Sequence, residues 1–283
     1  MKIGIIGSAD RAVAWEKHLR PHGSVSEVTI TPRLSEVGDV DACLLLTEDS
    51  QQLDLLLETV KAGYHAFLIS PLPTDTNKVE KIYYAAQEAN VLLQFSHWPT
   101  LAPASKWMAK KVSKPSFIQV SRKISYTEYR ESGRGFDYYW IDELAFCLRW
   151  INGSVHHMDL KTIELSQGNI YGLHMLLRFE SGSTANIYIN VASSSSEHSR
   201  LASNNLFLLD CNVLNQTVRI GEENESGHLF FNKQTFDASK AAELAVQNFI
   251  KAIQLNRPTV YNGHHLLELN KTADKVRKRL ARS

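Results

Sequence analysis

Short apolar runs alternate with helix-compatible segments along the first 95 residues, and this alternation constrains the fold more than any other feature. The run at residues 41–47 is continuously apolar between its polar ends, which is typical of parallel strands covered by helices on both faces. Strands and helices that alternate at this spacing form a right-handed, doubly wound parallel sheet. The runs expected to be strands are residues 2–7, 25–31, 41–47, 66–69 and 91–95.

The pattern changes after about residue 115, where strand-like runs with alternating polar positions replace the continuous apolar ones. Residues 180–183 predict a hairpin turn between two of these strands. A helix is expected near residues 141–150, and helical apolar stripes at 246–253 and 266–280 close the chain. The strand-like runs are residues 117–124, 162–165, 173–179, 184–191 and 206–210.

The chain is therefore predicted to be an α/β protein with two domains, as its 283 residues also suggest. Residues 1–115 are expected to form a Rossmann-like, doubly wound parallel sheet. Residues 116–283 are expected to form an α+β domain with a mostly antiparallel sheet, whose closing helices can pack back on the first domain.

Composition and charge disfavour several classes of protein. The chain has 31 Lys and Arg against 30 Asp and Glu, a net charge of +1, whereas nucleic-acid binders usually have a basic excess. No apolar run approaches the roughly 18 residues of a membrane span. Cys43, Cys147 and Cys211 lie far apart and form neither a disulfide framework nor a zinc motif. We expect a cytoplasmic protein without a metal site, nucleic-acid partner or membrane partner.

The turn after the first expected strand has part of a phosphate-binding pattern. Gly7, Ser8, Ala9 and Asp10 stand where the fingerprint GxGxxG would hold a pyrophosphate at a helix N-terminus. Only the first glycine is present, because Ala9 and Ala12 replace the other two. A methyl group at the second position stands where the pyrophosphate approaches the backbone, so the motif alone is a weak signal.

Nearly the whole chain resembles the Gfo/Idh/MocA family of dehydrogenases, named after glucose-fructose oxidoreductase and inositol dehydrogenase. The segments that carry the resemblance are residues 39–42 with Thr47, 62–65 with Pro71, 94–97 with 103–104, 176–182 and 249–258. The resemblance implies NAD or NADP as cofactor and a small carbonyl or alcohol substrate, such as a sugar derivative. It also implies a homo-oligomer that associates through the C-terminal sheet.

The resemblance also assigns positions to the cofactor. Gly7, Ser8, Ala9 and Asp10 would line the pyrophosphate turn. Further contacts would come from the next strand–helix loop and from the border of the nicotinamide, at Thr47, Glu48, Asp49, Ser70 and Pro71.

The adenosine half departs from the family pattern. The stretch between Arg33 and Asp41 is too short for the helix and strand that the family places there. The acidic residue that usually holds the ribose hydroxyls after the second strand is absent, and residues 31–33 read Thr-Pro-Arg. Arg33 is either a contact for a 2′-phosphate, which favours NADP, or an ordinary surface arginine.

The catalytic half departs further. Ser70 replaces the lysine of the family's Glu-Lys-Pro motif, and a serine is a poor general acid. Glu143 falls on the position of the family's acid/base histidine, and Phe146 on that of its aspartate. The remaining candidates for the catalytic proton donor are His97, at the end of a strand, and Glu143. If residues 137–143 form a substrate site, Glu143 or Asp142 would serve as a base with a pKa tuned by burial.

These departures leave two functional hypotheses. The first is an NAD(P)-dependent oxidoreductase with altered catalytic residues. The second is a non-catalytic relative that keeps the fold for ligand sensing or as a partner subunit. The polar and aromatic stretch at residues 137–143 fits both, as a substrate site or as core aromatics beside helix N-terminal charges.

Overall fold

The computed structural model describes residues 1–47, 51–165 and 168–281. The chain divides into two compact units. Unit 1 comprises Met1–Leu101 and Ser239–Lys271, and unit 2 comprises Ala102–Ala238 and Thr272–Ser283.

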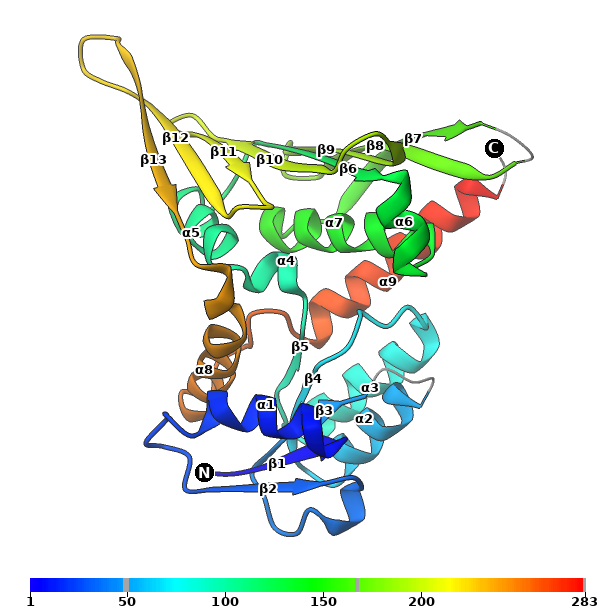
Figure 1. Ribbon diagram of the computed structural model, residues 1–283, viewed down its shortest axis with the longest axis vertical. Helices are drawn as coiled ribbons and strands as arrows, with labels where there is room; N and C mark the ends of the chain where they lie inside the picture. Colours follow the sequence, from blue (N-terminus) through cyan, green and yellow to red (C-terminus); the bar gives the residue numbers. More distant parts are fainter. Residues whose placement is uncertain (48–50, 166–167, 282–283) are drawn as a thin grey trace. The chain divides into compact units, whose positions relative to one another are not determined.

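Unit 1 is built on a parallel sheet in which the described strands follow the order β2-β1-β3-β4-β5 (Figure 1). Its central strand β3 is buried at every position, as the continuous apolar run predicts. The order reverses beside β1, and this reversal creates the crevice in which open α/β sheets bind ligands. The strands are β1 (Lys2–Gly7), β2 (Glu27–Thr31), β3 (Ala42–Leu46), β4 (His65–Leu68) and β5 (Leu93–Phe95).

Helices cover this sheet and complete its core. The closing helix α8 (Ala241–Gln254) shares one hydrophobic cluster with α1 and the sheet, because Val246, Phe249 and Ile250 pack against Leu19 and Phe67. The short link between β2 and β3 holds only one 3-10 turn. The other elements are α1 (Ala9–Leu19), η1 (Leu34–Glu36), α2 (Gln52–Lys61), α3 (Thr76–Glu88), α4 (Trp98–Leu101), η2 (Ala238–Lys240) and α9 (Gly263–Leu280), which ends in unit 2.

Unit 2 is built on a mixed sheet in the order β13-β12-β11-β10-β6-β9-β8-β7. Its neighbouring strands are antiparallel except for β6 and β9, which run parallel. The strands are β6 (Phe117–Ser125), β7 (Val155–Glu164), β8 (Ile170–Phe179), β9 (Thr184–Ser193), β10 (Glu197–Ser203), β11 (Leu208–Asn212), β12 (Thr217–Glu223) and β13 (Leu229–Thr235). The helices are α5 (Pro103–Lys111), α6 (Tyr126–Ser132) and α7 (Phe136–Ile151).

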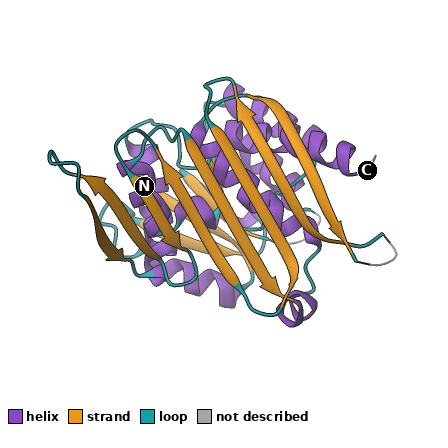
Figure 2. Cartoon of the chain, turned by 90° about the horizontal axis from the view of Figure 1, so that it is seen from above, coloured by secondary structure: helices purple, strands orange, loops and turns teal. Residues whose placement is uncertain are grey.

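The two faces of this sheet differ. Ile187, Ile189 and Val191 of β9 are fully buried on the face that α7 covers. Tyr188 and Asn190 alternate with them on the other face, onto which Figure 2 looks and where no described helix lies across the strands. The predicted fold class, a doubly wound parallel sheet followed by a mostly antiparallel one, is confirmed.

A membrane-spanning helix and a cluster of metal-binding side chains are both absent from the part of the chain that the structure describes. None of the helices formed by residues 1–47, 51–165 and 168–281 is both long and apolar enough to cross a bilayer. The same residues contain no group of three or more His, Cys, Asp or Glu side chains that could hold a metal ion.

Candidate functional site

A cavity of about 660 Å³ opens at the carboxyl ends of β1, β2 and β3, at the point where the strand order reverses. Its walls combine apolar side chains, suited to a flat ring, with hydroxyl, amide and charged groups suited to a sugar or phosphate. The lining residues come from the three strand ends and from α2: Ile6, Gly7, Ser8, Pro32, Arg33, Leu34, Ser35, Leu46, Thr47, Gln51, Asp54, Leu55 and Glu58.

The turn from β1 into α1 forms one wall of this cavity. A Cβ atom at Gly7 would lie 2.8 Å from Leu46 Cβ and 3.1 Å from the Leu46 carbonyl oxygen, so only glycine fits between the strands. Ser8 caps α1 with extended backbone, and its hydroxyl makes no capping hydrogen bond. The first-turn N–H groups of α1 therefore keep their capacity to bind an anion.

The residues after β2 form the opposite wall. Thr31 is buried, and its Oγ1 donates to Glu36 Oε2 at 2.9 Å while accepting from the Arg33 N–H at 3.3 Å. These bonds fold residues 31–36 into a tight turn, so that Arg33 and Ser35 line the cavity and Glu36 does not.

The ends of β4 and β5 are tied together by two serines. Ser96 Oγ accepts from the Ser70 N–H at 3.0 Å and donates to the Ser70 carbonyl at 2.8 Å. The Ser70 hydroxyl donates to the carbonyl of Pro71 at 3.0 Å. Ser70 is therefore a buried group with local partners.

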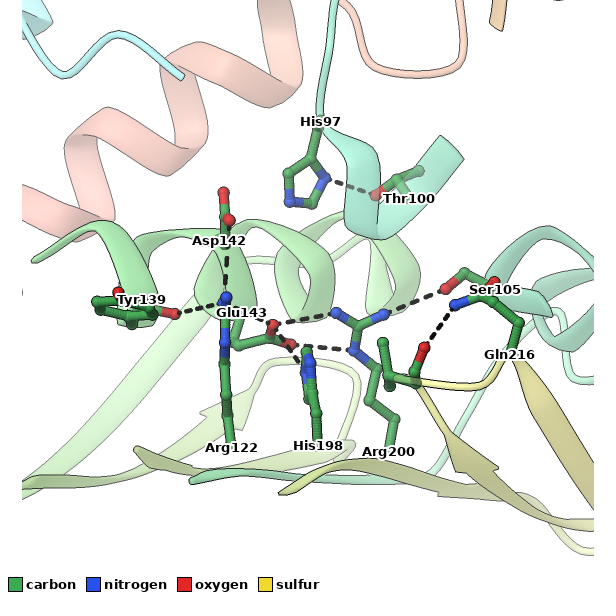
Figure 3. Close-up of polar contacts among 11 residues, drawn as sticks. His97, Thr100, Ser105, Arg122, Tyr139, Asp142, Glu143, His198, Arg200 and Gln216 are labelled. Carbon is green, nitrogen blue, oxygen red and sulfur yellow. Dashed lines mark hydrogen bonds and ion pairs between the residues drawn. The ribbon is translucent and has the colours of Figure 1, made fainter. Parts of the chain in front are cut away.

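His97 follows β5 and is almost completely buried. Its Nδ1 lies 2.7 Å from Thr100 Oγ1, and its ring centroid lies 4.7 Å from that of Tyr261 (Figure 3). The imidazole thus stabilises the turn that leads into α4.

Glu143 of α7 lies at the centre of a buried ionic cluster in unit 2. Arg122, His198 and Arg200 extend from β6 and β10 towards its carboxylate (Figure 3). Arg200 donates to both carboxylate oxygens at 3.0 Å, while His198 Nε2 lies 3.1 Å and Arg122 Nη1 3.4 Å from Oε1. Burial alone would raise the pKa of Glu143, but Arg200, then His198 and Arg122, hold that pKa well below its usual range.

The pKa of the neighbouring Asp142 is shifted in the opposite direction. Its carboxylate is 17% exposed and lies 3.9 Å from Arg122 Nη1, farther from the strands than Glu143 (Figure 3). Burial raises the pKa of Asp142 to about 7, because the attraction of Arg122 only partly offsets the loss of solvation. Adjacent carboxylates on one helix therefore differ in protonation near neutral pH.

Comparison of the sequence with protein-family models and with curated proteins found no match, but solved structures share its architecture. UDP-N-acetylglucosamine 3-dehydrogenase from Acidithiobacillus ferrooxidans has a TM-score of 0.80 at 16% identity, over 97% of this chain and 96% of that one. A dehydrogenase from Chromobacterium violaceum has a TM-score of 0.78 at 11% identity, over 99% and 95%. Levoglucosan dehydrogenase in complex with NADH and levoglucosan has a TM-score of 0.79 at 9% identity, over 100% and 97%.

The chain has the Gfo/Idh/MocA fold. At these identities the likeness is one of fold, and it confirms the architecture that the sequence resemblance implies.

The structure places some of the residues that the sequence predicts to contact the cofactor in one cavity, and it places others outside that cavity. Gly7, Ser8 and Thr47 line the cavity, and Ala9 and Asp10 follow on the first turn of α1, outside the lining. Ser70 and Pro71 lie at the end of β4 and are not part of the cavity wall. Glu48 and Asp49, also predicted to contact the cofactor, lie outside the described residues.

Sequence reasoning missed the partners of Glu143. His198, Arg200 and Ala202 alternate along β10 on its core-facing side, and Arg122 pairs with His198 in the register of β6 and β10. Cationic residues at core-facing positions of a strand are rare unless they are paired. This alternation was the signal that could have revealed the cluster.

Proposed function

We propose that the chain is an NAD(P)-dependent oxidoreductase that transfers a hydride to or from a carbon of a small, sugar-derived carbonyl or alcohol. The observation that carries the proposal is the cavity at the reversal of the strand order. There Gly7 permits the close approach of β1 and β3, and Ser8 begins the helix whose N–H groups remain available.

The solved structures support the sugar-derived substrate. One of them is named as a dehydrogenase of a nucleotide sugar, and another holds both NADH and the sugar levoglucosan. A bound nicotinamide supplies the hydride acceptor or donor, so the protein has to orient the reacting carbons and move one proton.

In this proposal Gly7, Ser8, Ala9 and Asp10 form the turn beside the pyrophosphate. The apolar part of the cavity, with Leu34 and Leu55, suits the adenine ring. Thr47, Ser70 and Pro71, at the ends of β3 and β4, contact the rest of the dinucleotide.

We assign the proton transfer to Asp142 and a positioning role to Glu143. Both oxygens of Glu143 accept from Arg200, so this carboxylate is a poor proton acceptor. Asp142 is partly exposed and titrates near neutral pH, which suits general acid–base catalysis. In proteins that the chain resembles, the segment corresponding to this part of α7 faces the nicotinamide. His97, the other candidate, is engaged by Thr100.

A second function is favoured by a specific observation at Ser70. Its hydroxyl and N–H bond to Pro71 and Ser96, so the place of the family's cationic group is taken by a closed local network. A chain that kept the cavity and lost hydride transfer would act as a ligand sensor or a partner subunit.

Titration with NADH and NADPH, followed by nicotinamide fluorescence, tests the proposal. Micromolar dissociation constants, equivalent to about −8 kcal/mol, together with turnover of a sugar or sugar nucleotide support the oxidoreductase. Binding without turnover across such a panel supports the sensor. Absence of binding of either nucleotide at millimolar concentration overturns the oxidoreductase and leaves the partner subunit.

We also propose that the chain self-associates through the sheet of unit 2. Strand β13 is an edge strand exposed along its whole length, and it carries Leu229, Phe230 and Phe231 at the surface. An edge of this kind pairs readily with a second copy of itself. The free, buried cysteines Cys43 and Cys147 support a reducing compartment, and we propose the cytoplasm.

A further inference from the structure

In this architecture the residues at the end of β2 determine whether the site favours an adenosine ribose with a free 2′-hydroxyl or one with a 2′-phosphate. In NAD-specific sites of this architecture a carboxylate at this strand end accepts hydrogen bonds from the ribose hydroxyls, and it would repel a phosphate. Here the strand ends at Thr31, whose hydroxyl donates a hydrogen bond to the carboxylate of Glu36. Glu36 is the nearest carboxylate in the following turn, and it does not line the cavity.

Arg33 takes the place of that carboxylate at the cavity wall. Its side chain is exposed, and its guanidinium makes no hydrogen bond or ion pair with any residue in 1–47, 51–165 or 168–281. Ser35, two residues later, adds a hydroxyl to the same wall. A guanidinium with unused donors beside a hydroxyl is well suited to bind a phosphate dianion.

The acidic side chains of the cavity come from the other wall, on α2. Both oxygens of Asp54 lie 2.9 Å from Lys78 Nζ, so its charge is locally compensated. Glu58 lies one helical turn farther along α2 from Asp54, and α2 does not follow β2 in the chain. Among the lining residues that directly follow β2, Pro32 to Ser35, the charged side chain is that of Arg33.

We propose that this site selects the dinucleotide that carries a 2′-phosphate, NADP(H), over NAD(H), with Arg33 as the specificity-determining residue and Ser35 as a second donor. The inference rests on the proposed function, because it presumes a nicotinamide dinucleotide in the cavity. It goes further by choosing between two cofactors that the family uses.

The size of the expected preference for NADPH follows from the hydrogen bond that Arg33 would donate to the charged 2′-phosphate. A hydrogen bond to a charged group contributes about 1.5–3 kcal/mol, which corresponds to a preference of about tenfold to a hundredfold. Since the rest of the two dinucleotides is identical, the ratio of their dissociation constants isolates the contribution of the 2′-phosphate.

The test measures dissociation constants of NADPH and NADH for the full chain and for three variants. Arg33→Ala removes the guanidinium and Ser35→Ala the hydroxyl. Arg20→Ala is the matched control, because it also removes one positive charge. Arg20 lies at the C-terminal end of α1, where it pairs with Glu16, and it does not line the cavity. Circular dichroism of each variant verifies the fold.

The wild type and Arg20→Ala should bind NADPH about tenfold or more tightly than NADH. Arg33→Ala should reduce this ratio to about one, mostly by weakening NADPH, and Ser35→Ala should reduce it by a smaller factor. Equal affinities in the wild type, or a ratio that Arg33→Ala leaves unchanged, overturn the inference while the oxidoreductase stands. Failure of both nucleotides to bind overturns the proposed function and this inference with it.

Discussion

Arg200 and Glu143 form a bidentate ion pair in which both side chains are almost completely excluded from solvent. Nε and Nη2 of Arg200 each lie 3.0 Å from one oxygen of Glu143, and Nη1 donates to Ser105 Oγ at 3.2 Å. The guanidinium also lies 4.1 Å from the ring centroid of Phe146. The pair joins α7 to β10 and α5, so its first role is to hold unit 2 together.

Glu143→Gln should lower the free energy of unfolding by about 3–5 kcal/mol at pH 7, because the buried guanidinium of Arg200 would lose its counter-charge. Urea unfolding measures the loss. Glu197→Gln is the control, since its pair with Lys123 lies on the same sheet but is exposed, so its loss should leave stability nearly unchanged.

The pH dependence of the same variant has a definite sign. Because the pKa of Glu143 is lowered on folding, its stabilisation is complete above the unfolded value of 4.5 and is lost as the pH falls through the folded value. The difference between wild type and Glu143→Gln should therefore be the same at pH 7 and pH 6. A difference below about 1 kcal/mol at both values contradicts the buried ion pair.

The sequence predicted the architecture better than it predicted the site. Strands β1, β3 and β4 of unit 1 are apolar runs, so their existence follows from burial, and their parallel arrangement follows from right-handed connections. Strands β10, β12 and β13 escaped prediction, and β13 is exposed at every position and has no apolar periodicity. The family resemblance singled out Glu143, but its partner Arg200 lies 57 residues away on β10. The approach of Arg200, His198 and Arg122 to one carboxylate depends on the register of β6 and β10.

Gly7→Ala should weaken nucleotide binding and lower stability by about 1–3 kcal/mol, because the added methyl group would meet Leu46 in the adjacent strand. Gly23→Ala is the matched control, since a Cβ there meets no atom within 4 Å. Thermal unfolding and titration with NADPH measure the two effects. Wild-type binding by a folded Gly7→Ala variant would contradict the assignment of the β1–α1 turn to the pyrophosphate.

Phe231→Lys should weaken self-association at least tenfold, because it places a charge on the exposed edge strand β13. Sedimentation velocity over a range of concentrations measures the change. Leu255→Lys is the control, because Leu255 is similarly exposed but lies at the end of α8 in unit 1. Equal association of both variants and the wild type would exclude β13 from the interface.

Asp142→Asn should stabilise the protein above pH 7 and leave its stability unchanged at pH 3. Burial raises the pKa of Asp142 from 3.8 to about 7, so the folded chain keeps a proton that the unfolded chain releases. Stability therefore falls as the pH rises from about 4 to 7, by no more than about 4 kcal/mol for a shift of this size. Urea unfolding across this range measures the difference, whose sign is opposite to that for Glu143→Gln.

The same carboxyl should control the rate of the proposed reaction. If Asp142 moves the proton, kcat/KM for the substrate should change slope near pH 7 in the wild type, and Asp142→Asn should lower kcat/KM by about 10²- to 10⁴-fold. The dissociation constant of NADPH should stay the same, because Asp142 belongs to α7 and not to the cavity at β1. A variant that kept its rate and its slope near pH 7 would move the proton transfer to another group, for which His97 is the remaining candidate at a strand end.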